Sequence, residues 1–162
     1  MNSYEIVVIT LKHLNISVET VDHDPALTIE QADIFIEGIP GVRTKTMFLT
    51  NKKKTNFYLI IMDEGKKIDL NKFKETVDDK QIKIASENTL FEKMMLLPGV
   101  VSPFGLLNDK NHDIKVYIDK EIMNEERMSF HPNTNTKTIF INTTDLLRFL
   151  KSIGYNVNFV DI

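Results

Sequence analysis

Hydrophobic residues that recur every three to four positions predict helices in several parts of the chain. The first run follows Asn2, a residue type that caps helices, and stops at Asn15; its apolar members are Tyr4, Val7, Val8, Leu11 and Leu14. The segment Thr-Ile-Glu-Gln at 28–31 has the form of a capping box and predicts a short helix through about Ile34.

Three further helices are marked by residues that begin or end such elements. Asp69 precedes one amphipathic run, and Ser86 precedes a second that must end before Pro98. Residues 142–145, Asn-Thr-Thr-Asp, form a cap for a helix over Leu146–Ile153, which Gly154 terminates.

Two runs rich in β-branched and aromatic residues, Met47–Leu49 and Phe57–Met62, predict an antiparallel hairpin whose tip is the polar segment Thr50–Thr55. Further strands are expected at Ile114–Ile118, Thr138–Ile141 and, as an edge strand, Val157–Val160. Strands and helices are interspersed without the strict alternation of a doubly wound fold. The pattern therefore predicts an α/β or α+β domain with a mixed sheet.

Composition narrows the class of protein. With 162 residues and 42% hydrophobic content, the chain fits one domain over residues 1–162 that buries about 70% of its unfolded surface. The absence of cysteine excludes disulfides, thiolate zinc sites and cysteine nucleophiles, and favours a reducing, cytoplasmic compartment. No stretch has the length or pattern of a signal peptide or membrane span.

The net charge of −3 and the pI near 5.8 argue against a protein that binds nucleic acid over a wide surface. We expect no DNA binding, and any contact with tRNA must be local. The candidate tRNA contacts are Lys52, Lys53 and Lys54 at the hairpin tip, although a solvated tip explains the same residues.

Several common catalytic motifs are absent. The chain has no Gly-x-Ser-x-Gly elbow, no Gly-x-x-x-x-Gly-Lys phosphate loop, no Gly-x-Gly-x-x-Gly and no His-Glu-x-x-His. Its four histidines are scattered singly, so we expect neither a metal nor a cofactor.

The segment 97–109, Leu-Pro-Gly-Val-Val-Ser-Pro-Phe-Gly-Leu-Leu-Asn-Asp, combines two glycines and two prolines in an apolar stretch. A glycine N–H can approach a ligand oxygen closely, and proline restricts the backbone that holds it. Such preset donors suit a developing oxyanion. Ser102 lies between Val101 and Pro103, where a turn hydrogen bond is a better explanation of its hydroxyl than a nucleophile.

Together with Gly-Val-Arg-Thr-Lys-Thr-Met-Phe-Leu at 41–49 and Ser-Phe-His-Pro at 129–132, this segment resembles the YbaK/ProX family of aminoacyl-tRNA editing domains. The resemblance extends from about Ile16 to Ile153. It implies a curved, partly closed mixed β-sheet flanked by helices, and hydrolysis of wrongly charged aminoacyl-tRNA. The chain most resembles the freestanding alanyl-tRNA(Pro) deacylases.

The resemblance also implies site residues. Lys45, which composition alone would make an ordinary solvent-facing lysine, would orient the substrate as a point charge. Gly99 and Gly105 would lie nearest the scissile carbonyl oxygen. Residues expected to bind substrate are Thr46, His23, Ser102, Pro103, Phe104, Asn108 and His131. On the residues alone, a histidine beside a proline is more often a turn or packing residue.

The expected activity is hydrolysis of alanyl-tRNA(Pro), with prolyl-tRNA synthetase as a further candidate partner. Two alternatives stay open: a cysteinyl-tRNA(Pro) deacylase, and a non-catalytic module that binds tRNA or a synthetase. Alanine-specific family members often carry Asn after the lysine, whereas this chain has Thr46. Thr46 is therefore a departure from the alanine-specific pattern.

Overall fold

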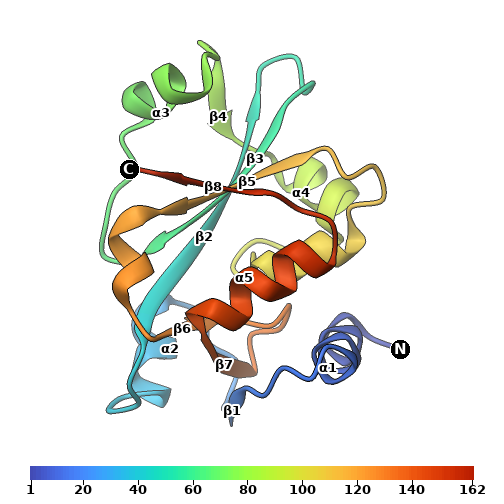
Figure 1. Ribbon diagram of the computed structural model, residues 1–162, viewed down its shortest axis with the longest axis vertical. Helices are drawn as coiled ribbons and strands as arrows, with labels where there is room; N and C mark the ends of the chain where they lie inside the picture. The colour runs from blue at the N-terminus through green and yellow to red at the C-terminus, as the bar shows by residue number, and fades with distance from the viewer.

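The computed structural model describes all 162 residues, and eight strands form one mixed sheet in the order β1-β7-β6-β2-β3-β5-β8, with β4 also paired to β2 (Figure 1). The strands are β1 (Glu19–Asp22), β2 (Val42–Asn51), β3 (Phe57–Asp63), β4 (Ile82–Ile84), β5 (Ile114–Asp119), β6 (Arg127–Phe130), β7 (Lys137–Asn142) and β8 (Val157–Val160). The expected mixed sheet is confirmed, because β2 runs antiparallel to β3 but parallel to β6.

The helices cover the sheet, which separates two apolar cores. They are α1 (Ser3–His13), α2 (Ile29–Phe35), α3 (Leu70–Val77), α4 (Glu87–Met94) and α5 (Thr143–Ser152). The larger core includes residues from α1, α4 and α5, and the smaller one lies against α3. None of these helices is long and apolar enough to cross a membrane.

Helix caps formed largely where the sequence predicted them. The side chains of Asn2, Thr28 and Asp69 each accept a hydrogen bond from the backbone N–H three residues later. The capping box at Thr28 is modified, because the Gln31 side chain accepts from the N–H of Leu27 rather than from that of Thr28. The last helix begins at Thr143, earlier than expected, and Asn142 caps it without a side-chain hydrogen bond.

Strand β2 is longer than its apolar run predicted, and this length places the site. Its first residues pair with β6, its last residues pair with β4, and β3 lies along its other edge. Thr50 and Asn51, assigned to the exposed tip from the sequence, are buried strand residues. The exposed tip is confined to residues 52–55.

The segment predicted to be a ligand-facing loop is partly a buried 3-10 helix, η1 (Pro103–Asn108). Only its N-terminal part, from Leu97 to Val101, remains an open loop after α4. A second 3-10 helix, η2 (Lys120–Asn124), follows β5.

Candidate active site

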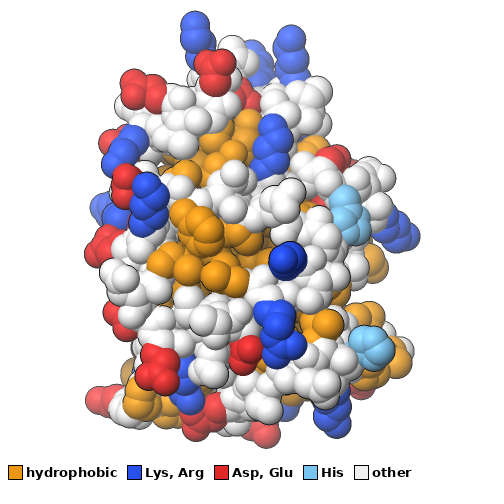
Figure 2. Space-filling view, viewed as in Figure 1, with side chains coloured by type: hydrophobic (Ala, Val, Ile, Leu, Met, Phe, Trp, Pro, Cys, Tyr) orange, Lys and Arg blue, Asp and Glu red, His pale blue; other side chains and the backbone are white.

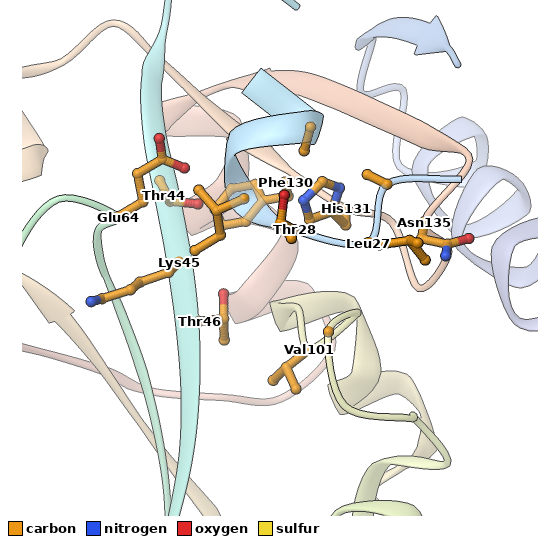
Figure 3. A pocket seen from close by; sticks show the side chains of 14 residues that line it. Leu27, Thr28, Thr44, Lys45, Thr46, Glu64, Val101, Phe130, His131 and Asn135 are labelled. Carbon is orange, nitrogen blue, oxygen red and sulfur yellow. The ribbon is translucent and has the colours of Figure 1, made fainter. Parts of the chain in front are cut away.

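A cavity of about 280 Å³ opens between the start of α2, the middle of β2, the loop after α4 and the end of β6 (Figure 3). Segments distant in sequence therefore build its walls. The lining residues include Leu27, Ile29, Ala32, Thr44, Lys45, Thr46, Glu64, Gly99, Val101, Phe130 and His131.

Lys45 and Gly99 line this one cavity. Lys45 lies in β2 opposite Met62 of β3, and its ammonium makes no hydrogen bond or ion pair within the protein. In Figure 3 its side chain extends away from His131 and Val101, across β2. Its side chain alternates with those of Thr44 and Thr46 along β2, so its unpaired charge lies beside the cavity rather than inside it.

The loop at Gly99 presents unpaired backbone donors. Gly99 has a φ of +90°, and a Cβ there would have no heavy atom within 4 Å. The N–H of Val100 donates to the carbonyl of Leu97 at 3.3 Å, whereas the N–H groups of Gly99 and Val101 donate to no acceptor in the protein. Two free N–H groups at one cavity wall are suited to hold an oxygen that gains negative charge.

His131 contributes a neutral imidazole to the same cavity. Its Nδ1 is buried and has no hydrogen-bond partner. Burial lowers the pKa of His131 below its usual value, and the neighbouring His23 lowers it further, while a backbone hydrogen bond to Lys137 acts in the opposite direction. The ring is therefore uncharged at neutral pH and retains one free polar atom.

Helix α2, which forms one wall, is held in place by Arg43. The Arg43 guanidinium donates to the carbonyls of Gly41, Ile36 and Ile39, each at 2.9 Å. Two of these carbonyls lie at or just after the end of α2, so one side chain of β2 fixes the end of the helix.

A pair of carboxyl groups joins α2 to the end of β3. Burial and a hydrogen bond to Asp33 raise the pKa of Glu64 to about 8, although the nearby charge of Arg43 lowers it. Glu64 therefore holds its proton more tightly than an exposed glutamate does. Because Glu64 also lines the cavity, this contact helps to set the distance between two of its walls.

The comparison with known proteins identifies the family. The sequence model of one protein family, described as the aminoacyl-tRNA editing domain, matches residues 23–149. This chain belongs to that family.

Two relatives resemble this editing domain over most of its length. The prolyl-tRNA editing protein ProX of Acetoanaerobium sticklandii is 31% identical over 100% of this chain and 99% of its own. The prolyl-tRNA synthetase associated domain-containing protein 1 of Mus musculus is 31% identical over 88% of this chain and 86% of its own.

The fold of the editing domain also occurs among solved structures. A protein described as a candidate trans-editing enzyme for prolyl-tRNA synthetase superposes with a TM-score of 0.75 at 16% identity, over 100% of this chain and 98% of that one. The hypothetical protein APE2540 gives the same TM-score at 15% identity, over 90% and 93% of the two chains.

Several residues predicted to contact substrate are buried or engaged in hydrogen bonds away from the cavity of the editing domain. Gly105 is buried, and its N–H donates to the Ser102 carbonyl at 3.1 Å, so it has no free donor for a substrate oxygen. Pro103 and Phe104 are also buried in η1. The Asn108 amide donates to the carbonyl of Met94 at 2.8 Å. None of these residues lines the cavity.

The Ser102 hydroxyl forms the turn hydrogen bond that its neighbours suggested. It accepts from the N–H of Phe104 at 3.2 Å and donates to Asn133 Oδ1 at 2.8 Å. Ser102 is fully buried. It therefore stabilises the junction between the loop and η1 rather than facing a substrate.

His23 occupies a supporting position in the editing domain. Its Nδ1 donates to the Asp24 carbonyl at 2.8 Å, its Nε2 lies 2.9 Å from the Thr138 hydroxyl, and its ring stacks on Phe35. Both nitrogens are thus engaged. His131 and Thr46, by contrast, line the cavity where the sequence placed them.

The three candidate tRNA-contact lysines, Lys52, Lys53 and Lys54, are exposed at the β2–β3 tip. Figure 2 shows basic side chains projecting from the end of the molecule that carries this tip and α3. The tip lies about 23 Å from Lys45, given seven residues of extended strand. These lysines are therefore outside the cavity, at the far end of the hairpin whose strand β2 lines it.

Two parts of the site had no signal in the sequence. Arg43 and the pair Glu64–Asp33 act through partners from other elements, and no local motif marks such contacts. Nowhere in the chain do three or more histidine or acidic side chains cluster in a way that could hold a metal ion.

Proposed function

We propose that this editing domain hydrolyses the ester bond of mischarged aminoacyl-tRNA(Pro), and that alanyl-tRNA(Pro) is its main substrate. The observation that carries the proposal is that Lys45, Gly99 and Val101 line one cavity, and that the N–H groups of Gly99 and Val101 are free. An aminoacyl ester is already activated, so positioning, a bound water and an oxyanion site suffice for cleavage.

In the proposed reaction, a water oxygen attacks the ester carbonyl and forms a tetrahedral intermediate. The N–H groups of Gly99 and Val101 hold the carbonyl oxygen as it becomes an oxyanion. The neutral side chain of His131, in the cavity wall, positions the attacking water. The C–O bond to the ribose then breaks, and the ribose oxygen leaves with a proton derived from the water.

Lys45 anchors the substrate in this proposal. Its ammonium has no partner in the empty protein, so binding a phosphate or ribose oxygen breaks no existing ion pair. A single point charge beside the cavity orients the nucleotide end while the aminoacyl group enters.

Alanine fits the proposal because the wall formed by α2 brings Ile29 and Ala32 against the cavity. A synthetase pocket built for proline cannot strongly reject a smaller amino acid, since a missing methylene is worth about 1 to 3 kcal/mol. A second site that admits alanine and excludes the proline ring solves this problem. Prolyl-tRNA synthetase would then be the source of the substrate, and the cytoplasm the place of action.

A panel of purified aminoacyl-tRNAs tests the proposal, with release of free amino acid as the measurement. We expect rapid release from alanyl-tRNA(Pro), slower release from cysteinyl-tRNA(Pro) and none above the spontaneous rate from prolyl-tRNA(Pro). Faster release of cysteine would assign the chain to the cysteinyl alternative. Binding of tRNA without release of any amino acid would make it a non-catalytic module and refute the proposal.

A further inference from the structure

Strand β2 has an unpaired stretch of edge between its two neighbours. β6 pairs with β2 only at Val42 and Arg43, and β4 pairs with it from Leu49 onward. Ala85, just after β4, donates to the Phe48 carbonyl at 3.0 Å, so the edge that faces away from β3 is uncovered only from Thr44 to the N–H of Phe48. Backbone groups on this stretch are therefore available to a ligand.

Hydrogen-bond alternation along the β2–β3 pair identifies those groups. Glu64 N–H donates to the Arg43 carbonyl at 2.9 Å, and Asn51 N–H donates to the Asn56 carbonyl at 3.3 Å. Odd-numbered β2 residues thus bond to β3, and even-numbered residues direct their N–H and C=O to the other edge. The carbonyl of Thr46 and the N–H of Phe48 point there and have no partner.

A second cavity of about 210 Å³ lies against this edge. Its walls are mainly apolar and include Ile84, Ala85, Leu90 and Pro98. It shares Thr46, Gly99 and Val101 with the first cavity, so the two are neighbours across the oxyanion loop. Figure 3 shows Thr46 and Val101 near one another at this boundary.

The unpaired acceptor and donor match one common ligand. Adenine presents an amino group at N6 beside an acceptor at N1, and its flat faces favour apolar or aromatic walls. The carbonyl of residue i and the N–H of residue i+2 project side by side from a strand edge. The strand edge thus offers an acceptor beside a donor between apolar walls, which complements adenine. Hypoxanthine has an acceptor at O6 and a donor at N1, the reverse of adenine, and does not match this edge.

We propose that the second cavity binds the terminal adenine of the tRNA, with N6 donating to the Thr46 carbonyl and N1 accepting from the Phe48 N–H. This inference rests on the proposed function, because the base must lie next to the ester. The ribose then crosses the boundary at Gly99 and Val101, and the aminoacyl group enters the first cavity. Recognition through backbone atoms leaves no side-chain motif in the sequence.

A stable amide analogue of the substrate end, 3′-alanylamino-3′-deoxyadenosine, tests this assignment by titration calorimetry. We expect the matching inosine analogue, whose N1 donates and whose O6 accepts, to bind at least tenfold more weakly. Equal affinity for the two analogues would overturn the proposal. Because binding is measured without hydrolysis, the result is independent of whether the protein cleaves alanyl-tRNA(Pro).

A variant that fills the cavity gives a second measurement. Ala85→Leu places a larger side chain in the second cavity and should weaken binding of the adenosine analogue at least tenfold. Asn88→Leu, at an exposed position of α4 outside the cavity, is the control and should bind as the parent does. Unchanged binding by a folded Ala85→Leu protein would place the base elsewhere.

Discussion

The backbone N–H of Gly105 donates to the carbonyl of Ser102 at 3.1 Å. Because of this bond, Gly105 and Gly99, the two glycines of the apolar segment 97–109, have different roles. Gly105 is part of the core, whereas Gly99 keeps its N–H free at the cavity.

Substitution of each glycine by alanine should therefore have different effects. A Cβ on Gly105 would lie 2.6 Å from Leu96 Cδ1 and 2.7 Å from Met94 Cε, so Gly105→Ala should lower the free energy of unfolding by about 1 to 3 kcal/mol. Urea unfolding measures this change. The folded fraction should retain its kcat.

Gly99→Ala should instead reduce kcat for alanyl-tRNA(Pro). The φ of +90° strains any residue with a Cβ, so the loop shifts and its N–H leaves the oxyanion position. Loss of one such donor lowers kcat about 100-fold or more. Single-turnover rates measure the effect, and a kcat equal to that of Gly105→Ala would refute the role of Gly99.

Ile29→Ala should relax the exclusion of proline. The Ile29 side chain lines the cavity and is 48% exposed, so its truncation widens the site with little loss of stability. We expect measurable hydrolysis of prolyl-tRNA(Pro) in this variant. Ile34→Ala on the same helix, 69% exposed and outside the cavity, is the control; if both variants behave alike, α2 does not set specificity.

Glu64→Gln should change how stability depends on pH. The folded protein holds the Glu64 proton up to about pH 8, whereas the unfolded chain releases it near the ordinary pKa of 4.5. Glu64 therefore makes stability fall as pH rises between these values, because the unfolded state binds fewer protons. Glutamine keeps a neutral donor for Asp33 and cannot ionise.

Thermal midpoints across this pH range check the prediction. The fall in Tm with rising pH should be smaller in Glu64→Gln than in the parent protein. Glu30→Gln, at an exposed position in the first turn of α2, should follow the parent. Parallel curves for all three proteins would show that Glu64 is ionised when folded.

Replacing Lys52, Lys53 and Lys54 together by alanine should raise KM for full-length alanyl-tRNA(Pro) and leave kcat unchanged. These exposed lysines lie too far from the cavity to touch the ester, so they can contribute only through phosphates. The salt dependence of KM should weaken in the variant. An unchanged KM at low salt would mean that the tip is merely solvated.

Elements with local signals could be predicted from the sequence. Asn2, Thr28 and Asp69 cap helices through hydrogen bonds to residues three positions away, and such contacts are visible in a short window. Strands β1, β4 and β6 have only three or four residues. Such short strands carry little periodic pattern and form because a distant strand pairs with them, although β8, equally short, was predicted.

The site was predictable only in part for a similar reason. The family resemblance placed Lys45, Gly99 and His131, which line the cavity. It also suggested Gly105. The sequence of an apolar segment with two glycines does not distinguish a glycine that faces a ligand from one that lies under a core side chain. Arg43 could not be identified, since its three carbonyl partners lie outside β2.

The central claim is that the cavity lined by Lys45 and Gly99 cleaves the ester of alanyl-tRNA(Pro). The most direct measurement is the rate of alanine release by Lys45→Ala beside that of Lys67→Ala, which replaces an exposed lysine outside the cavity. We expect Lys45→Ala to lose about 100-fold or more in rate with an unchanged Tm, and Lys67→Ala to match the parent. Equal rates in the two variants would contradict the account.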